Sequence, residues 1–159
     1  MKRIAILDDY MNVARNTADW ESIPETEITV FTAHIADENR MAEVLAAFEI
    51  IVIMRERSPF PKSLLDRLPN LELLVTTGMR NLSVDLETTR RNGVTVCGTQ
   101  MMRNAPFELT WALIMAITKK IPAENQSMHN GGWHTEVGIG LKGKTLGILG
   151  LGSLGTEVA

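Results

Sequence analysis

Five short apolar runs, separated by segments with helix signals, constrain the fold more than any other feature of the chain. The runs lie at residues 3–7, 28–31, 50–54, 71–75 and 94–97. Asp37 precedes an i, i+3, i+4, i+7 pattern of apolar side chains, and Gly93 follows a segment that Ser83 or Asp85 opens. Strands that alternate with helices form right-handed βαβ units around a parallel sheet. We therefore expect residues 1–99 to form an α/β, flavodoxin-like, doubly wound domain with strand order 2-1-3-4-5.

Two of the runs carry further expectations about burial. Residues 50–54 are continuously apolar and largely β-branched, which is typical of a strand covered on both faces. The last run ends in Cys97, the single cysteine of the chain. One cysteine excludes an internal disulfide and fits a reducing cytoplasm. No cation beside it would stabilise a thiolate, so we expect a buried structural thiol.

A long apolar segment follows at about residues 105–121, with Asn104 as a candidate cap and Pro106 in the first turn. Apolar side chains occupy nearly its whole circumference, which is typical of a helix buried on both sides. We interpret this helix as the connector between two domains and as a subunit contact. Residues 122–144 contain several glycines and are expected to form a loop-rich passage.

A glycine motif closes the sequence. Residues 145–149 suggest a short buried strand, and Gly150, Gly152 and Gly155 then give G-x-G-x-x-G at the opening of a helix. The first glycine permits a tight turn, the second lets phosphates approach the backbone, and the third lets helix and strand pack closely. Pyrophosphate binds at such a helix N-terminus. We therefore expect residues 100–159 to be the connector helix and the beginning of a Rossmann domain. Its NAD or NADP contacts are predicted at Gly150, Gly152, Ser153, Leu154 and Gly155.

A second ligand site is expected where the strands of the first domain end. Residues 8–10, 55–57 and 78–81 meet at the carboxyl edge of the sheet, where open parallel sheets bind ligands. Guanidinium groups and the N–H groups of a glycine turn suit a small anion. The predicted substrate contacts are Arg55, Glu56, Gly78, Met79 and Arg80. In the alternative interpretation, Arg55 and Arg57 only pair with nearby carboxylates in solvent.

The acidic pair Asp8-Asp9 also occurs at the end of the first strand in phosphoacceptor receiver domains. Those domains need a third aspartate after strand three and a lysine after strand five. This chain has Arg55-Glu56 and Gly98-Thr99 at those places, which excludes the receiver class. We expect the acidic pair to cap the helix that follows it.

Composition excludes other classes of partner. The net charge of −3 and a pI near 5.6 provide no basic face for nucleic acid. The apolar runs are too short to span a bilayer, and the N-terminus turns acidic too soon for a secretory signal. The three histidines lie far apart without acidic neighbours at metal-ligand spacing, so no metal site is expected.

Several segments together resemble the D-isomer-specific 2-hydroxyacid dehydrogenases, the family of phosphoglycerate dehydrogenase and of glyoxylate or hydroxypyruvate reductase. The matching stretches follow the family's order at residues 54–60, 71–81, 105–109, 132–133 and 143–155. The resemblance implies a substrate domain at 1–99 and an NAD(P) domain that begins near residue 100. It also implies a small 2-hydroxy or 2-oxo acid whose carboxylate meets the backbone of residues 78–80, near Arg55. Family members are usually homodimers that bury the 105–121 helix.

The family's catalytic arginine, glutamate and histidine lie downstream of the glycine motif, so no catalytic residue is expected in this chain. The acidic residue that selects NAD over NADP is likewise expected roughly 20 residues past the glycine turn. We therefore expect the N-terminal portion of an NAD(P)-dependent oxidoreductase, catalytically incomplete alone. The alternative is a non-catalytic remnant, a flavodoxin-like domain that binds a small anion or a partner subunit.

Overall fold

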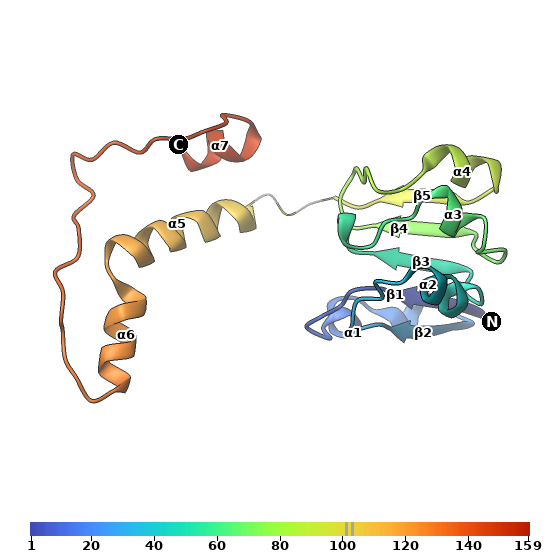
Figure 1. Cartoon of the computed structure of the whole chain (residues 1–159), viewed down its shortest axis with the longest axis horizontal. Helices are drawn as coiled ribbons and strands as arrows, with labels where there is room; N and C mark the ends of the chain where they lie inside the picture. The colour runs from blue at the N-terminus through green and yellow to red at the C-terminus, as the bar shows by residue number, and fades with distance from the viewer. Residues whose placement is uncertain (101, 103) are drawn as a thin grey trace. The chain divides into compact units, whose positions relative to one another are not determined.

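The structure is a computed structural model that describes residues 1–100, 102 and 104–159. The chain divides into two compact units, Met1–Met101 and Met102–Ala159, which are described separately below. Figure 1 traces the chain by colour through both units. The assignment of a substrate domain to residues 1–99 and of a nucleotide domain to residues 100–159 stays a prediction.

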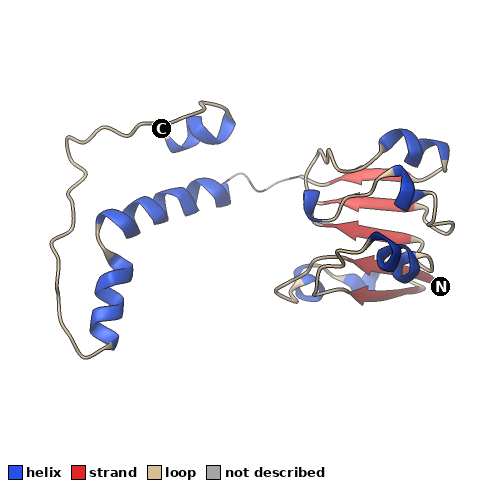
Figure 2. Ribbon diagram, viewed as in Figure 1, coloured by secondary structure: helices blue, strands red, loops and turns tan. Residues whose placement is uncertain are grey.

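The first unit is built on a five-stranded parallel sheet in the order β2-β1-β3-β4-β5, drawn in red in Figure 2. β1 pairs with both β2 and β3, so the chain order of the strands reverses at β1. The expected α/β class and the expected strand order are both confirmed. The strands are β1 Lys2–Ile6, β2 Thr26–Val30, β3 Ile50–Ile53, β4 Leu73–Thr76 and β5 Thr95–Gly98.

Short helices connect these strands. Asp37 caps α2 by accepting a hydrogen bond of 2.8 Å from the Arg40 N–H. Asp85, rather than Ser83, caps α4 through the Thr88 N–H at 2.9 Å. The segment between β1 and β2 forms two short helical pieces, α1 and η1. The helical elements of this unit are α1 Ala14–Thr17, η1 Trp20–Ser22, α2 Glu38–Leu45, η2 Arg55–Arg57, α3 Lys62–Leu65 and α4 Leu86–Arg91.

The core lies on the face of the sheet that α2 and α3 cover. Ala5, Ile51 and Leu74 occupy neighbouring register positions on β1, β3 and β4, and all three are fully buried. Leu45 of α2 and Leu64 of α3 are buried in the same cluster. Because these side chains come from five elements, the cluster joins the helix layer to the sheet.

The opposite face is covered only in part. Ile6, Val52, Val75 and Cys97 form the next row across the sheet. Exposure rises along this row, from buried Ile6 through half-buried Val52 and Val75 to exposed Cys97. Two expectations are therefore wrong for the described chain. The third strand is covered fully on one face only, and Cys97 is exposed because it lies on the edge strand, far from the α1 side of that face.

The second unit contains three helices among its described residues, α5 Asn104–Thr118, α6 Ile121–His129 and α7 Ser153–Val158. The expected strand at residues 145–149 is wrong, because this segment runs extended without a strand partner and stays largely exposed. A strand needs a neighbour to satisfy its backbone N–H and C=O groups, and the described residues of this unit supply none. Across residues 1–100, 102 and 104–159, no helix combines the length and apolar character that a bilayer crossing requires.

Helix α5 is also less covered than its sequence predicts. None of its residues is buried, and Leu109 and Ile117 are 59% and 71% exposed. The helix ends at Thr118, earlier than expected, where Lys120 takes a left-handed conformation with φ of 58°. The expectation of burial on both sides is wrong for the described chain, because α6 and α7, which contact α5, leave much of its apolar surface exposed.

Helix α6 replaces the first part of the expected loop at 122–144. Pro122 lies in its first turn, a position that favours a helix start. The Glu124 carboxylate accepts hydrogen bonds from the Thr135 and Glu136 N–H groups at 3.0 Å and 2.8 Å. The Thr135 N–H lowers the pKa of Glu124 most, because it stabilises the charged carboxylate. These bonds tie α6 to the loop that follows it.

Two leucines should differ in their contribution to the stability of the first unit. Leu45→Ala should lower the free energy of unfolding by about 2–5 kcal/mol, because the fully buried side chain leaves a cavity. Leu82→Ala should change it by less than about 0.5 kcal/mol, because Leu82 is 94% exposed. Urea denaturation followed by circular dichroism measures both. Equal effects of the two substitutions would contradict the assigned core.

Candidate substrate and cofactor sites

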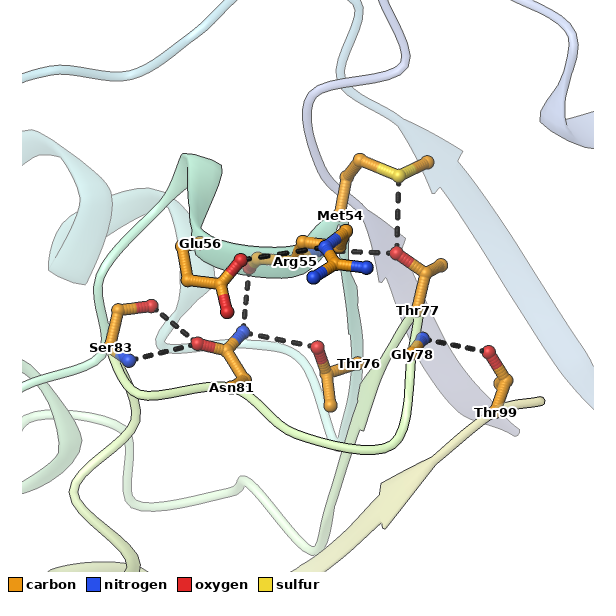
Figure 3. Close-up of polar contacts among 9 residues, drawn as sticks. All are labelled: Met54, Arg55, Glu56, Thr76, Thr77, Gly78, Asn81, Ser83 and Thr99. Atoms are coloured by element: carbon orange, nitrogen blue, oxygen red, sulfur yellow. Dashed lines mark hydrogen bonds and ion pairs between the residues drawn. The ribbon is translucent and has the colours of Figure 1, made fainter. Parts of the chain in front are cut away.

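The first candidate site lies where β3 and β4 end (Figure 3). Arg55 begins η2 directly beyond the end of β3, in a left-handed conformation with φ of 49°. Such a conformation costs a non-glycine residue about 1–3 kcal/mol, and residues of this kind gather at functional sites. The Arg55 N–H donates to the Thr77 hydroxyl at 3.2 Å, which joins η2 to the end of β4.

The turn after β4 presents backbone donors. Gly78 has φ of 97°, and its N–H donates to the Thr99 hydroxyl at 3.0 Å, so that group is already satisfied. The next two N–H groups, of Met79 and Arg80, donate no hydrogen bond within residues 1–100, 102 and 104–159. Both residues are exposed. Consecutive N–H groups in a turn with a left-handed residue form a concave anion site.

The charged side chains at this edge support both interpretations given above. The Arg55 Nε lies 3.5 Å from the Glu56 carboxylate, and each side chain is about half exposed. Exposed ion pairs are worth only about 0–1 kcal/mol, so this contact does not hold Arg55 away from a ligand. Arg80 is exposed on the turn. The structure brings Arg55, Glu56 and residues 78–80 together, and their roles in binding stay predictions.

Asn81 connects the two halves of this edge through a contact that no sequence pattern indicates. Its Nδ2 donates to the Arg55 carbonyl at 2.6 Å and to the Thr76 hydroxyl at 3.0 Å (Figure 3). Its Oδ1 accepts from the N–H and the hydroxyl of Ser83 at 2.9 Å and 2.6 Å. The one local feature that points to Asn81 is an asparagine two residues before a serine in a loop. This pattern is common in turns that bind no ligand.

Gly98 sets the distance between β5 and the Gly78 turn. A Cβ atom on Gly98 would lie 2.7 Å from the Gly78 carbonyl oxygen and 3.0 Å from the Met79 Cα. Both neighbours are backbone atoms, which cannot rotate away as a side chain can. The end of β5 therefore approaches the turn closely only because residue 98 is glycine.

The two aspartates at the end of β1 have different hydrogen-bond partners. Asp9 accepts from the Val13 and Ala14 N–H groups at 3.1 Å and 2.8 Å, so it caps the α1 segment as expected. Asp8 instead is 2% exposed and takes no part in that cap. The Arg57 guanidinium donates to the Asp8 carbonyl at 2.9 Å and stacks 4.7 Å from the Tyr10 ring centroid. Arg57 is therefore held by β1 and its loop.

The Asp8 carboxylate binds two residues that the sequence analysis did not connect to it. It accepts from the Ser58 hydroxyl at 2.7 Å and lies 2.9 Å from the His34 Nδ1. Ser58 is 1% exposed, so its hydroxyl is out of reach of a substrate. This arrangement holds the ends of β1, β2 and β3 together and is no nucleophile site. No short sequence motif could reveal it, because the three residues are 24 or more positions apart.

The second candidate site is the glycine turn before α7. Gly150 has φ of 89°, and a Cβ atom on Gly155 would lie 2.2 Å from the Gly150 carbonyl oxygen. Gly152 has open space around the position of a Cβ atom. The N–H groups of Ser153 and Leu154 donate no hydrogen bond within the part of the chain that the structure describes. An open glycine beside unpaired N–H groups fits the pyrophosphate of a dinucleotide.

Comparison with known proteins agrees with this geometry. Residues 111–159 match the family described as "D-isomer specific 2-hydroxyacid dehydrogenase, NAD binding domain". A phosphoglycerate oxidoreductase from Vibrio cholerae superimposes on 99% of the chain with a TM-score of 0.89 at 39% identity. The chain belongs to the D-isomer-specific 2-hydroxyacid dehydrogenase family. The expected cofactor class, NAD(P), is confirmed by the same match.

The curated members of this family that match are much longer than the chain. Human D-3-phosphoglycerate dehydrogenase is 35% identical over 111 residues, which are 68% of this chain and 21% of that protein. Glyoxylate reductase from Aeropyrum pernix is 34% identical over 106 residues, 60% of this chain and 32% of that protein. The chain also spans 51% of the Vibrio cholerae structure.

The close approach of β5 to the turn gives a test of the first site. Gly98→Ala should displace the Gly78–Met79 backbone and destabilise the chain by about 1–3 kcal/mol, because the added methyl overpacks against backbone. NMR amide shifts of Gly78 and Met79 report the displacement, and urea denaturation reports the stability. Gly140→Ala is the control, since a Cβ atom there meets open space. Unchanged Gly78 and Met79 shifts in Gly98→Ala would contradict the described contact.

Proposed function

We propose that the chain is the N-terminal portion of an NAD(P)-dependent oxidoreductase that moves a hydride between a nicotinamide and a small 2-hydroxy or 2-oxo acid. One observation carries the substrate half of the proposal. The Met79 and Arg80 N–H groups, which have no partner among the residues that the structure describes, lie on the turn after β4, and Arg55 lies just beyond the end of the adjacent strand β3. Backbone donors beside a guanidinium are suited to a carboxylate.

The proposed binding mode gives each predicted site residue a place. The substrate carboxylate accepts from the Met79 and Arg80 N–H groups on the turn that Gly78 opens. Arg55 neutralises its charge, and Glu56 lies beside the Arg55 guanidinium at the 3.5 Å distance of the weak ion pair. On the cofactor side, Gly150 and Gly155 shape the turn, and the pyrophosphate meets Gly152 and the N–H groups of Ser153 and Leu154. NAD or NADP, when bound, supplies the hydride chemistry.

Exposed apolar surface on this portion supports the proposal that further polypeptide covers it in the functional protein. The Val52, Val75 and Cys97 row of a parallel sheet stays partly open, although such sheets are ordinarily covered on both faces. Residues 145–149 are apolar in pattern and lack a strand partner. We propose that the catalytic groups and the missing cover both come from residues outside this chain, and that the chain alone is inactive.

The exposed apolar side of α5 supports a homodimer. Leu109, Leu113 and Ile117 are each more than half exposed on this helix. Apolar side chains on a protein surface mark interaction sites when they form a contiguous patch. We propose that two copies of the protein associate through the helix at residues 105–121. A cytoplasmic location is proposed from the single cysteine, which fits a reducing compartment.

The alternative proposal is a non-catalytic, flavodoxin-like domain that binds a small anion or a partner subunit. It is favoured by the location of the whole anion site in the first unit, which has its own core. The two proposals differ in one outcome, which is turnover of a 2-oxo acid by the protein made from the complete reading frame.

That protein should oxidise NADH or NADPH in the presence of glyoxylate or hydroxypyruvate. Arg55→Gln should raise the KM for the 2-oxo acid about tenfold or more, because a charged hydrogen-bond donor is lost. Arg90→Gln serves as the control and should leave the KM unchanged. Arg90 lies on α4, before the start of β5 and therefore at the opposite edge of the sheet from the candidate site. Loss of NADH absorbance measures both. No turnover across several 2-oxo acids would refute the oxidoreductase and favour the binding domain.

The glycine turn gives a test of the cofactor half in the same protein. Gly152→Ala should preserve the fold, because a Cβ atom there meets open space, but should weaken NADH binding about tenfold or more by overlapping the phosphates. Gly155→Ala should change the turn itself, since its Cβ atom would lie 2.2 Å from the Gly150 oxygen. NADH fluorescence measures binding, and NMR shifts of residues 150–155 measure the turn. Unchanged NADH affinity in Gly152→Ala would contradict the assignment.

A further inference from the structure

Asn81 uses its side-chain amide fully at the carboxyl edge of the sheet. Its two donor hydrogens reach the Arg55 carbonyl and the buried Thr76 hydroxyl, and its oxygen accepts twice from Ser83 (Figure 3). These partners belong to η2, to β4 and to the loop before α4. A single side chain therefore connects three segments that the sheet brings to one edge.

The bond to Arg55 acts on a residue with a left-handed backbone conformation. Arg55 adopts φ of 49°, a conformation that L-residues rarely take without support. Its carbonyl oxygen lies 2.6 Å from the Asn81 Nδ2 and its N–H lies 3.2 Å from the Thr77 hydroxyl. Both backbone groups of Arg55 are thus held by residues of β4 and its following turn.

The same side chain fixes the other half of the anion site. Asn81 directly follows Met79 and Arg80, whose N–H groups are unpaired in the described chain. Its Oδ1 bond to the Ser83 N–H closes a local turn two residues long. Gly78 anchors the start of this turn through Thr99, and Asn81 anchors its end. The two N–H groups are therefore held between two fixed points.

We propose that Asn81 is a positioning residue for 2-oxo acid binding, which sets the place of Arg55 relative to the Met79 and Arg80 N–H groups. The inference rests on the proposed function, because it assumes that these groups bind the substrate carboxylate. Asn81 itself does not touch the substrate. It holds two separate strand ends in one arrangement, and a carboxylate needs donors from both at the same time.

Asn70 provides a matched control. Its Nδ2 donates to the Ala46 carbonyl at 2.7 Å, so it ties the loop before β4 to the C-terminal end of α2 through an amide–carbonyl bond. Asn70 precedes β4, whereas Asn81 follows it, so the two residues lie at opposite ends of that strand. Asn70→Ala and Asn81→Ala therefore remove similar bonds at the edge without the anion site and at the edge with it.

The test measures oxalate affinity of the 159-residue chain by NMR titration of the Met79 and Arg80 amides. Oxalate is a small dicarboxylate probe of the carboxylate site. Asn81→Ala should weaken oxalate binding about five- to tenfold, the factor that corresponds to about one net hydrogen bond. It should also move the Arg55 Cα and Cβ shifts away from their left-handed values. Asn70→Ala should leave both the affinity and the Arg55 shifts unchanged.

A second pair of variants tests the positioning role of Asn81 if Asn81→Ala does not fold. Asn81→Asp keeps the shape of the side chain and the acceptor for Ser83, and it removes both donor hydrogens. Leu82→Asp adds the same charge at the adjacent, 94% exposed position without touching the contacts of Asn81. Asn81→Asp should weaken oxalate binding about fivefold more than Leu82→Asp does.

The outcomes separate the inference from the function on which it rests. Equal oxalate affinity of Asn81→Ala and the unsubstituted chain, or equal affinities of Asn81→Asp and Leu82→Asp, would overturn the positioning role and leave the proposed function standing. No oxalate-dependent shift of Met79 and Arg80 in the unsubstituted chain would overturn the proposed carboxylate site, and the positioning role with it.

Discussion

The parallel pairing of β3 with β4 is the interaction on which the candidate substrate site depends. Ile53 is in register with Thr76, so both strands end at the same level. The residues that follow, Arg55 on one side and the Gly78 turn on the other, therefore leave the sheet side by side. Nothing local in either segment requires this proximity. The backbone hydrogen bonds of the ladder produce it, and Asn81 then joins the two segments through its amide.

Three features of the chain share one physical cause, which is apolar surface without cover. The sheet row that ends in Cys97 is increasingly exposed, α5 has no buried residue, and residues 145–149 lack a strand partner. In each case the segment has the apolar residues of a buried element, because apolar side chains are most often found in the protein interior. Within the described chain, full cover reaches only the α2 and α3 face of the sheet, where the core forms, and the opposite face is covered in part, around Ile6.

Much of the first candidate site was predictable, and the failures have identifiable reasons. Arg55 and Gly78 follow apolar runs, so strand order alone places them at one edge. The buried contact of Asp8 with His34 and Ser58 was not predictable, because its members lie 24 or more positions apart and carry no shared motif. Helix α6 lies in a segment whose glycines indicate a loop, and Pro122 in its first turn is the local signal for a helix start.

The sequence by itself determined the α/β class, the order of the five strands, the cap at Asp37, and the glycine turn that identifies the cofactor class. These follow from local periodicity, capping chemistry and glycine conformation, all of which act over a few residues. Tertiary structure decided which sheet face is covered, that Gly98 must be glycine, and that Asn81 spans from β4 to Arg55. Those facts depend on atoms brought together by strand register, which no short stretch of sequence encodes.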